Sequence, residues 1–164
     1  MGIKYNEALD IKEKVRRIVE VMDLDYVNIN RVFFIRSHES SSRNIIARCH
    51  ALPKILQQVL EIEPAYVIEI LSEKFDRMSE EDQIKVLVHE LLHIPKSFGG
   101  GFRHHDFVQK RIVDKFYKMY KEKEKKHKFD EIKKTEIKEK LKEFNLDEEI
   151  NDSTETKQNS LWDF

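Results

Sequence analysis

A long charged segment limits the size of the core that this chain can build. Between Lys121 and Ile150, 20 of 30 residues are Lys, Glu or Asp, and their charges cancel. Such a segment has little apolar surface to bury, so it favours either a solvated helix with internal charge pairs or a final helix docked on the domain. We therefore expect one folded domain over residues 1–120, a charged helical extension over 121–150 and a disordered polar tail over 151–164.

Composition excludes several classes of protein. The chain has 30 Lys and Arg against 31 Asp and Glu, which argues against a generally basic nucleic-acid binder. Cys49 is the only cysteine, so no intramolecular disulfide can form and a reducing compartment is expected. No apolar run approaches the roughly 20 residues that span a bilayer, and the charged N-terminus does not resemble a signal peptide. We expect a cytoplasmic protein without membrane association or direct nucleic-acid contact.

The strand signals predict a small sheet. Residues 26–36 and 44–52 are rich in β-branched and aromatic side chains and flank a polar linker, which predicts a β-hairpin. A short helix is expected over 53–62, and the apolar run over 65–71 predicts a third strand. These segments predict a three-stranded antiparallel or mixed sheet.

Segments with helical periodicity precede and follow these strands. Apolar residues recur on one face over 10–23, where Asp10 could cap a first helix. Ser79 with an aspartate three residues later resembles a capping box, which predicts a helix over 79–94. Asp106 is expected to cap a last long helix. The fold class predicted is therefore α+β, with helices packed on the sheet.

The helix predicted over 79–94 carries the sequence HELLH. His89 and His93 are four residues apart, so their imidazoles leave the same side of a helix and can bind one zinc ion at about 2.0 to 2.1 Å. The apolar stripe of this helix lies on nearly the opposite side, which directs the histidines towards a cleft. Glu90 lies one step round the helix, where it could act on a water molecule.

A catalytic zinc site needs a third protein ligand and leaves a fourth position for water. The glycines at 99–101 can reverse the chain and return it over the helix, and two histidines follow them directly. His105 is the expected third ligand because it precedes the expected cap Asp106, which would hold it still. His104 is the alternative, and Asp106 could itself bind the metal or support a histidine.

These motifs carry a resemblance to a known family. The segment YVIEILSEKFDRMSEEDQIKVLVHELLHI, followed by a glycine turn and RHHD, resembles the metallopeptidase domain found in phages and archaea, and more loosely the SprT-like zinc peptidases. The likeness runs from about residue 32 to 116. The glycine and third histidine that mark metzincins are absent at their spacing, which excludes that group.

The resemblance implies a zincin-like fold and a zinc-dependent peptidase acting on a protein or peptide substrate. By motif match, His89 and His93 correspond to the helical zinc ligands of the family, and Glu90 to its catalytic glutamate. His105 with Asp106 corresponds to the downstream pair, and the doubled histidine leaves the third ligand open. The implied reaction is hydrolysis of a peptide bond by water that Zn²⁺ and Glu90 activate. Arg103, Lys96 and the histidine that does not bind metal are candidates to stabilise the oxyanion.

Two other functions compete with this one. In the first, zinc only braces the fold and the C-terminal QNSLWDF recruits a partner; Gln158, Leu161 and Phe164 match the spacing of the box that binds sliding clamps. An intact Glu90 argues against this non-catalytic adaptor, because a structural zinc site has no use for the carboxylate. In the second, the zinc site hydrolyses RNA or another non-peptide substrate, which ligand spacing alone does not distinguish from a peptidase.

Overall fold

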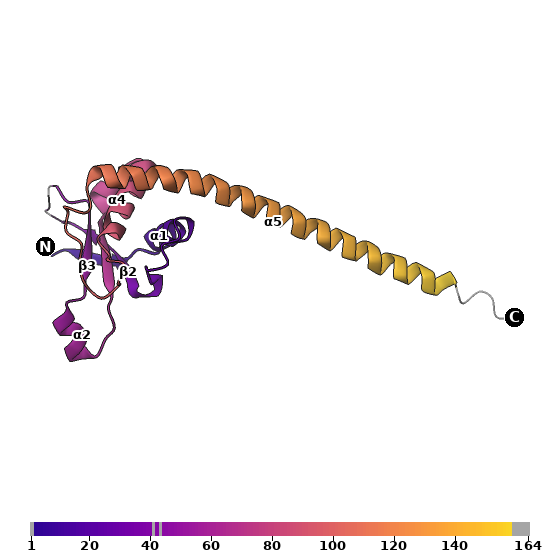
Figure 1. Cartoon of the computed structure of the whole chain (residues 1–164), viewed down its shortest axis with the longest axis horizontal. Coiled ribbons are helices and arrows are strands. Elements are labelled where there is room, and N and C mark those ends of the chain that lie inside the picture. Colours follow the sequence, from indigo (N-terminus) through magenta and orange to yellow (C-terminus); the bar gives the residue numbers. More distant parts are fainter. Residues whose placement is uncertain (1, 41, 43, 159–164) are drawn as a thin grey trace. The chain divides into compact units, whose positions relative to one another are not determined.

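The computed structural model describes residues 2–40, 42 and 44–158, with side chains as far as residue 142. Four strands and five α-helices follow one another along these residues (Figure 1). In chain order the elements are β1 (Lys4–Glu7), α1 (Leu9–Val21), the 3₁₀ turn η1 (Ile29–Arg31), β2 (Val32–His38), β3 (Ala47–Ala51), α2 (Lys54–Leu60), β4 (Tyr66–Leu71), α3 (Ser72–Phe75), α4 (Glu80–Leu92) and α5 (Lys110–Gln158).

The strands form one mixed sheet in the order β1-β2-β4-β3. β4 runs parallel to β2 and antiparallel to β3, and β1 is antiparallel to β2. The predicted α+β class is confirmed, but the predicted hairpin is wrong because β4 lies between β2 and β3. The physical reason is burial: five of the six β4 residues are buried, which suits a strand that has neighbours on both edges.

The sheet also contains a strand that the sequence pattern did not indicate. β1 is exposed at all four positions, so it has no buried apolar face to reveal it. The main core forms where α1 packs against β2 and α4 packs against β3. Its fully buried side chains include Ile11 and Ile18 from α1, Ile68 from β4 and Leu87 from α4.

The helix boundaries show which caps form. Ser79 caps α4, because its hydroxyl accepts the Asp82 N–H at 3.2 Å, which confirms the predicted start of this helix. The cap predicted at Asp10 is wrong: α1 begins one residue earlier, and the Asp10 carboxylate pairs instead with Arg36 at 2.6 Å. The cap predicted at Asp106 is also wrong, since α5 begins only at Lys110.

The chain divides into two compact units, residues 1–123 and 124–164. The structure gives α5 as helix as far as Gln158, and the domain boundaries near residues 120 and 150 remain predictions. Leu161 and Phe164 of the clamp-binding box lie outside the described residues. Among the described residues, no helix combines the length and the apolar character needed to cross a membrane.

Candidate metal centre

Three histidines from two segments meet at the end of α4. His89 lies in the last turn of the helix, and His93 is the residue that ends it. The Nε2 atoms of these two rings are 3.2 Å apart. His105 joins them from the segment before α5, and one ring nitrogen from each of the three histidines lies within 4.8 Å of the others. His104, the alternative in the sequence, is not part of this group among the described residues.

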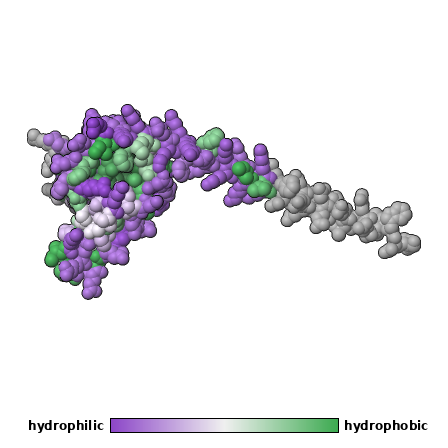
Figure 2. All heavy atoms as spheres, viewed as in Figure 1, coloured by the Kyte–Doolittle hydropathy of each residue, from purple (hydrophilic) through white to green (hydrophobic). Residues whose placement is uncertain are grey.

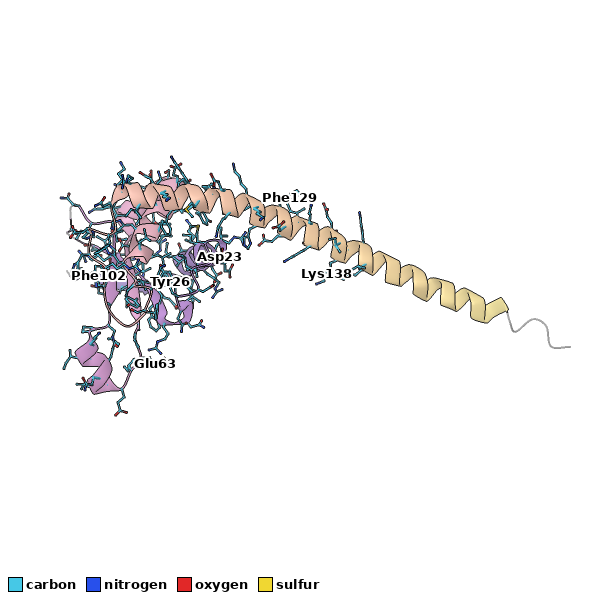
Figure 3. All side chains as sticks on the ribbon, viewed as in Figure 1. Asp23, Tyr26, Glu63, Phe102, Phe129 and Lys138 are labelled. Atoms are coloured by element: carbon cyan, nitrogen blue, oxygen red, sulfur yellow. The ribbon has the colours of Figure 1, made fainter. Side chains whose placement is uncertain are left out.

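Backbone and ring contacts orient His93. Its Nδ1 donates to the carbonyl oxygen of Arg103 at 2.6 Å, and the Arg103 N–H donates to the carbonyl of His93 at 2.8 Å. The ring of Phe102 stacks on the imidazole with 4.4 Å between centroids and an interplanar angle of 11°. Figure 3 labels Phe102 on the segment that precedes α5. With Nδ1 occupied as a donor, Nε2 of His93 is left as the acceptor that faces the other two rings.

The glycine turn before these contacts is tied to the sheet by one buried side chain. Tyr66 on β4 is fully buried, and its hydroxyl accepts the Gly100 N–H at 3.0 Å and donates to the Gly101 carbonyl at 2.9 Å. Gly100 has φ +76°, and a Cβ at this position would lie 1.9 Å from Nε2 of Gln57 on α2. The backbone conformation therefore favours glycine here, and any larger residue would also have to displace the end of the Gln57 side chain.

Glu90 is buried beside the edge strand. The residue is 6% exposed, and the backbone N–H of Cys49 on β3 acts on its carboxylate. Burial raises the pKa of Glu90 to about 7, although the hydrogen bond from Cys49 acts in the opposite direction. A carboxyl group with such a pKa can accept and release a proton near neutral pH.

His89 and His93 are kept neutral by their surroundings. Burial, with the neighbouring His93 and His105, lowers the pKa of His89 to about 4. The pKa of His93 is also lowered, first by burial and then by the other histidines, against the opposing effect of the Arg103 carbonyl. Neutral imidazole is the form that binds a metal ion, so these pKa shifts prepare both rings for ligation.

A cleft of about 780 Å³ opens beside this cluster. Its walls are residues 44–50 on and before β3, the outer side of α4, Phe102 with His105, and the first turn of α5. Both His89 and Glu90 line it, as expected from the helix periodicity. Arg103 and Lys96, the cations suggested for oxyanion stabilisation, do not line the cleft, whereas Lys85 and Lys110 do.

The geometry fits a metal ion. Tetrahedral ligands at 2.0 to 2.1 Å from one ion are about 3.3 to 3.4 Å apart, close to the 3.2 Å between Nε2 of His89 and Nε2 of His93. The third nitrogen, from His105, is within reach of both. The neutral rings of His89 and His93, and the Arg103 carbonyl acceptor that fixes the tautomer of His93, make this set suited to a divalent ion.

Several supporting groups carry no signal in the sequence. The carbonyl of Arg103 and the N–H of Cys49 act through the backbone, which every residue type possesses, so no motif could reveal them. In the sequence, Tyr66 and Phe102 look like ordinary aromatic residues of a buried strand and of a loop. Their roles follow from contacts across 9 residues for Phe102 with His93 and 35 residues for Tyr66 with Gly101, which only folding establishes.

Comparison with known proteins gives a family match. The model of a family described as putative phage metallopeptidase matches residues 3–145. Neither the curated proteins nor the solved structures yielded a match. The family match confirms the resemblance and extends it beyond the residues that first suggested it. Since it spans most of the chain, and the chain places three histidines and a buried glutamate on one cleft, the protein belongs to the phage metallopeptidase family.

Proposed function

We propose that this protein is a zinc-dependent metallopeptidase that hydrolyses peptide bonds of a protein substrate. The observation that carries the proposal is the position of Glu90. Its carboxyl lies on the same cleft as the three histidines and is buried enough to hold a pKa of about 7. A zinc ion that only braced the fold would not need a proton acceptor beside it.

The ligands in this proposal are His89, His93 and His105. Imidazole nitrogen is a common ligand of zinc, and three of them leave the fourth position of a tetrahedral ion open. Zn²⁺ bound there would supply Lewis acidity, which polarises a carbonyl group and makes water more acidic. The Arg103 carbonyl keeps the proton of His93 on Nδ1, so that Nε2 remains free to bind.

Glu90 moves the proton. Its carboxylate accepts a proton from the attacking water as the bond from water oxygen to the scissile carbonyl carbon forms. The resulting carboxylic acid donates that proton to the departing amine nitrogen as the C–N bond breaks.

The free edge of β3 favours a polypeptide substrate over RNA. Ile46 and Leu52 direct their backbone groups to β4 and its preceding residue. Because strand residues alternate, Ala47 and Ala51 direct theirs to the opposite edge, where the described residues place no other strand, and Cys49 points the same way with its N–H facing Glu90. An extended peptide can pair with such an edge, and this edge forms a wall of the cleft.

The rival function, a zinc-braced adaptor, has less support. Structural zinc sites are closed by four protein ligands. Within the described part of the chain, the candidate group contains three residues, and His104 is not in it. The number of available ligands therefore supports an open, catalytic type of site.

The test combines metal analysis with cleavage of an unfolded protein. We expect purified protein to bind one zinc ion and to cleave casein. Glu90→Gln should keep the zinc and lose about 10²- to 10⁴-fold in kcat, because it removes only the proton acceptor. His89→Ala should lose both zinc and activity. Glu80→Gln, at an exposed carboxylate in the first turn of α4, is the matched control and should behave as wild type.

Two results would refute the proposal. Undiminished cleavage by Glu90→Gln would remove this carboxyl from the reaction. A wild-type protein that binds zinc but cleaves neither casein nor any peptide would favour the adaptor, and cleavage of RNA instead would favour the second rival.

A further inference from the structure

Helix α2 exposes its apolar side chains instead of burying them. No residue of the helix is buried. Ile55 and Val59 are 66% and 69% exposed, and three neighbours are also exposed, to 42%, 55% and 44%: Leu56, Leu60 and Ile62. Figure 2 shows the hydrophobic atoms at the surface of α2. A contiguous apolar patch of this kind on one short segment is characteristic of a binding surface.

The chain places this patch at the end of the candidate substrate path. β3, whose free edge forms a wall of the cleft, continues through Leu52 and Pro53 directly into α2. Gln57 anchors the helix there, since its Nε2 donates to the carbonyl of Leu52 at 2.6 Å. The same side chain packs against Gly100, two residues before Phe102 of the cleft wall. Two walls of the cleft, the one formed by β3 and the one formed by Phe102, therefore lead to α2.

We propose that the apolar face of α2 is a docking surface for an apolar stretch of an extended polypeptide substrate, several residues from the bond that is cleaved. The inference rests on the proposed function and adds a substrate class. A chain paired with the edge of β3 must be extended, and a segment that is both extended and exposes clustered apolar side chains is typical of an unfolded protein. The surface therefore selects unfolded proteins over folded ones.

The distance sets the length of substrate that benefits. Cys49 marks the position of Glu90 on β3, and Pro53 opens α2 four residues later. At about 3.3 Å per residue, a substrate needs roughly four extended residues beyond the scissile bond to reach the helix. A six-residue peptide centred on the cleft is too short to bury the apolar face, whereas an 18-residue peptide is long enough.

Binding without turnover tests this directly. The probes are two fluorescent peptides with the same six central residues, one of them extended on both sides by a Gly-Ser-Gly spacer and Leu-Leu-Val. Fluorescence anisotropy gives Kd for each with the zinc-loaded full chain carrying Glu90→Gln. We expect the long peptide to bind at least about tenfold more tightly than the short one. Adding Ile55→Ser and Val59→Ser should abolish that gain and leave the short peptide unaffected.

Matched controls separate docking from general stickiness. Ile137→Ser with Leu141→Ser changes two α5 residues of similar exposure, 59% and 58%, and should leave the gain intact. A long peptide in which serine replaces the Leu-Leu-Val ends should bind like the short one. Circular dichroism of each variant verifies that the fold is retained.

The possible outcomes are distinct. Equal binding of both peptides, binding of neither, or a gain that survives the α2 substitutions would overturn the docking surface. Sedimentation that shows a dimer dissociated by those substitutions, without any change in peptide affinity, would assign α2 to a second copy of the chain and overturn it too. Failure of wild-type protein to cleave any substrate, with the long-peptide preference intact, would refute the peptidase function but not the docking surface.

Discussion

Tyr66→Phe tests whether the buried hydroxyl behind the glycine turn supports the metal centre. The substitution keeps the ring, which packs edge to face against Phe98, and removes only the oxygen. Two hydrogen bonds are lost, one from the Gly100 N–H and one to the Gly101 carbonyl. Each such bond contributes about 0.5 to 1.5 kcal/mol, so we expect the free energy of unfolding to fall by about 1 to 3 kcal/mol.

The same substitution should weaken metal binding. The turn leads into Phe102, Arg103 and His105, which stack on, orient and complete the histidine cluster. Loss of a supporting contact outside the ligands typically lowers metal affinity about 10- to 100-fold. Because Tyr66 acts through the turn and touches no ligand, we expect the lower end, about tenfold.

Two measurements check this expectation. Urea unfolding of the metal-free protein gives the change in stability, and competition with a chromophoric chelator gives the zinc affinity. Tyr5→Phe, which removes a hydroxyl from a side chain that is 57% exposed on β1, is the matched control and should change neither quantity. If Tyr66→Phe bound zinc as tightly as wild type, the turn would not position the third histidine, and the reasoning would be refuted.

Three further predictions follow from charges and from the chain end. The metal-free Glu90→Gln protein should lose stability as pH falls from 6.5 towards about 4, because His89 and His93 have lowered pKa values and the unfolded state binds protons first. The substitution is needed because the Glu90 carboxyl, with its pKa raised to about 7, binds a proton first in the folded state and opposes this loss. Acid titration followed by circular dichroism measures the change, and saturating zinc should flatten the profile. Arg36→Gln should reduce stability at neutral pH and raise the pKa of Asp10, because the hydrogen bond to Arg36 is the main cause that lowers this pKa. An NMR titration of the Asp10 carboxyl should show its pKa moving towards 3.8. A peptide of residues 151–164 should bind a sliding clamp in a competition titration, and no binding at high micromolar concentration would end that interpretation.

Local patterns predicted most of the elements but not their arrangement. α1, α2, β4 and α4 lie within a few residues of their predicted positions, because helical periodicity and runs of β-branched residues act over short stretches. The predicted hairpin failed because strand pairing depends on residues far apart. A strand buried on both faces takes the interior of the sheet, even when this separates two strands that are neighbours in sequence.

The starts of two helices show the same difference between local interactions and interactions across the chain. Ser79 and Asp82 are three residues apart and satisfy each other locally, so the cap could be recognised in the sequence. Asp10 has the residue type of a cap, but Arg36 on β2 lies within 2.6 Å of its carboxylate in the folded protein. A guanidinium brought from 26 residues away competes successfully with the helix N-terminus, and no local rule anticipates it.

The amino-acid sequence alone determined which side chains could meet on one helix: the four-residue spacing of His89 and His93, with Glu90 beside the first, depends only on helical periodicity. The tertiary structure decided the rest. It brought His105 instead of His104 to the pair, placed the Cys49 N–H against Glu90, and left the edge of β3 open beside them. These outcomes depend on packing between segments distant in the chain, where backbone atoms common to every residue make the contacts.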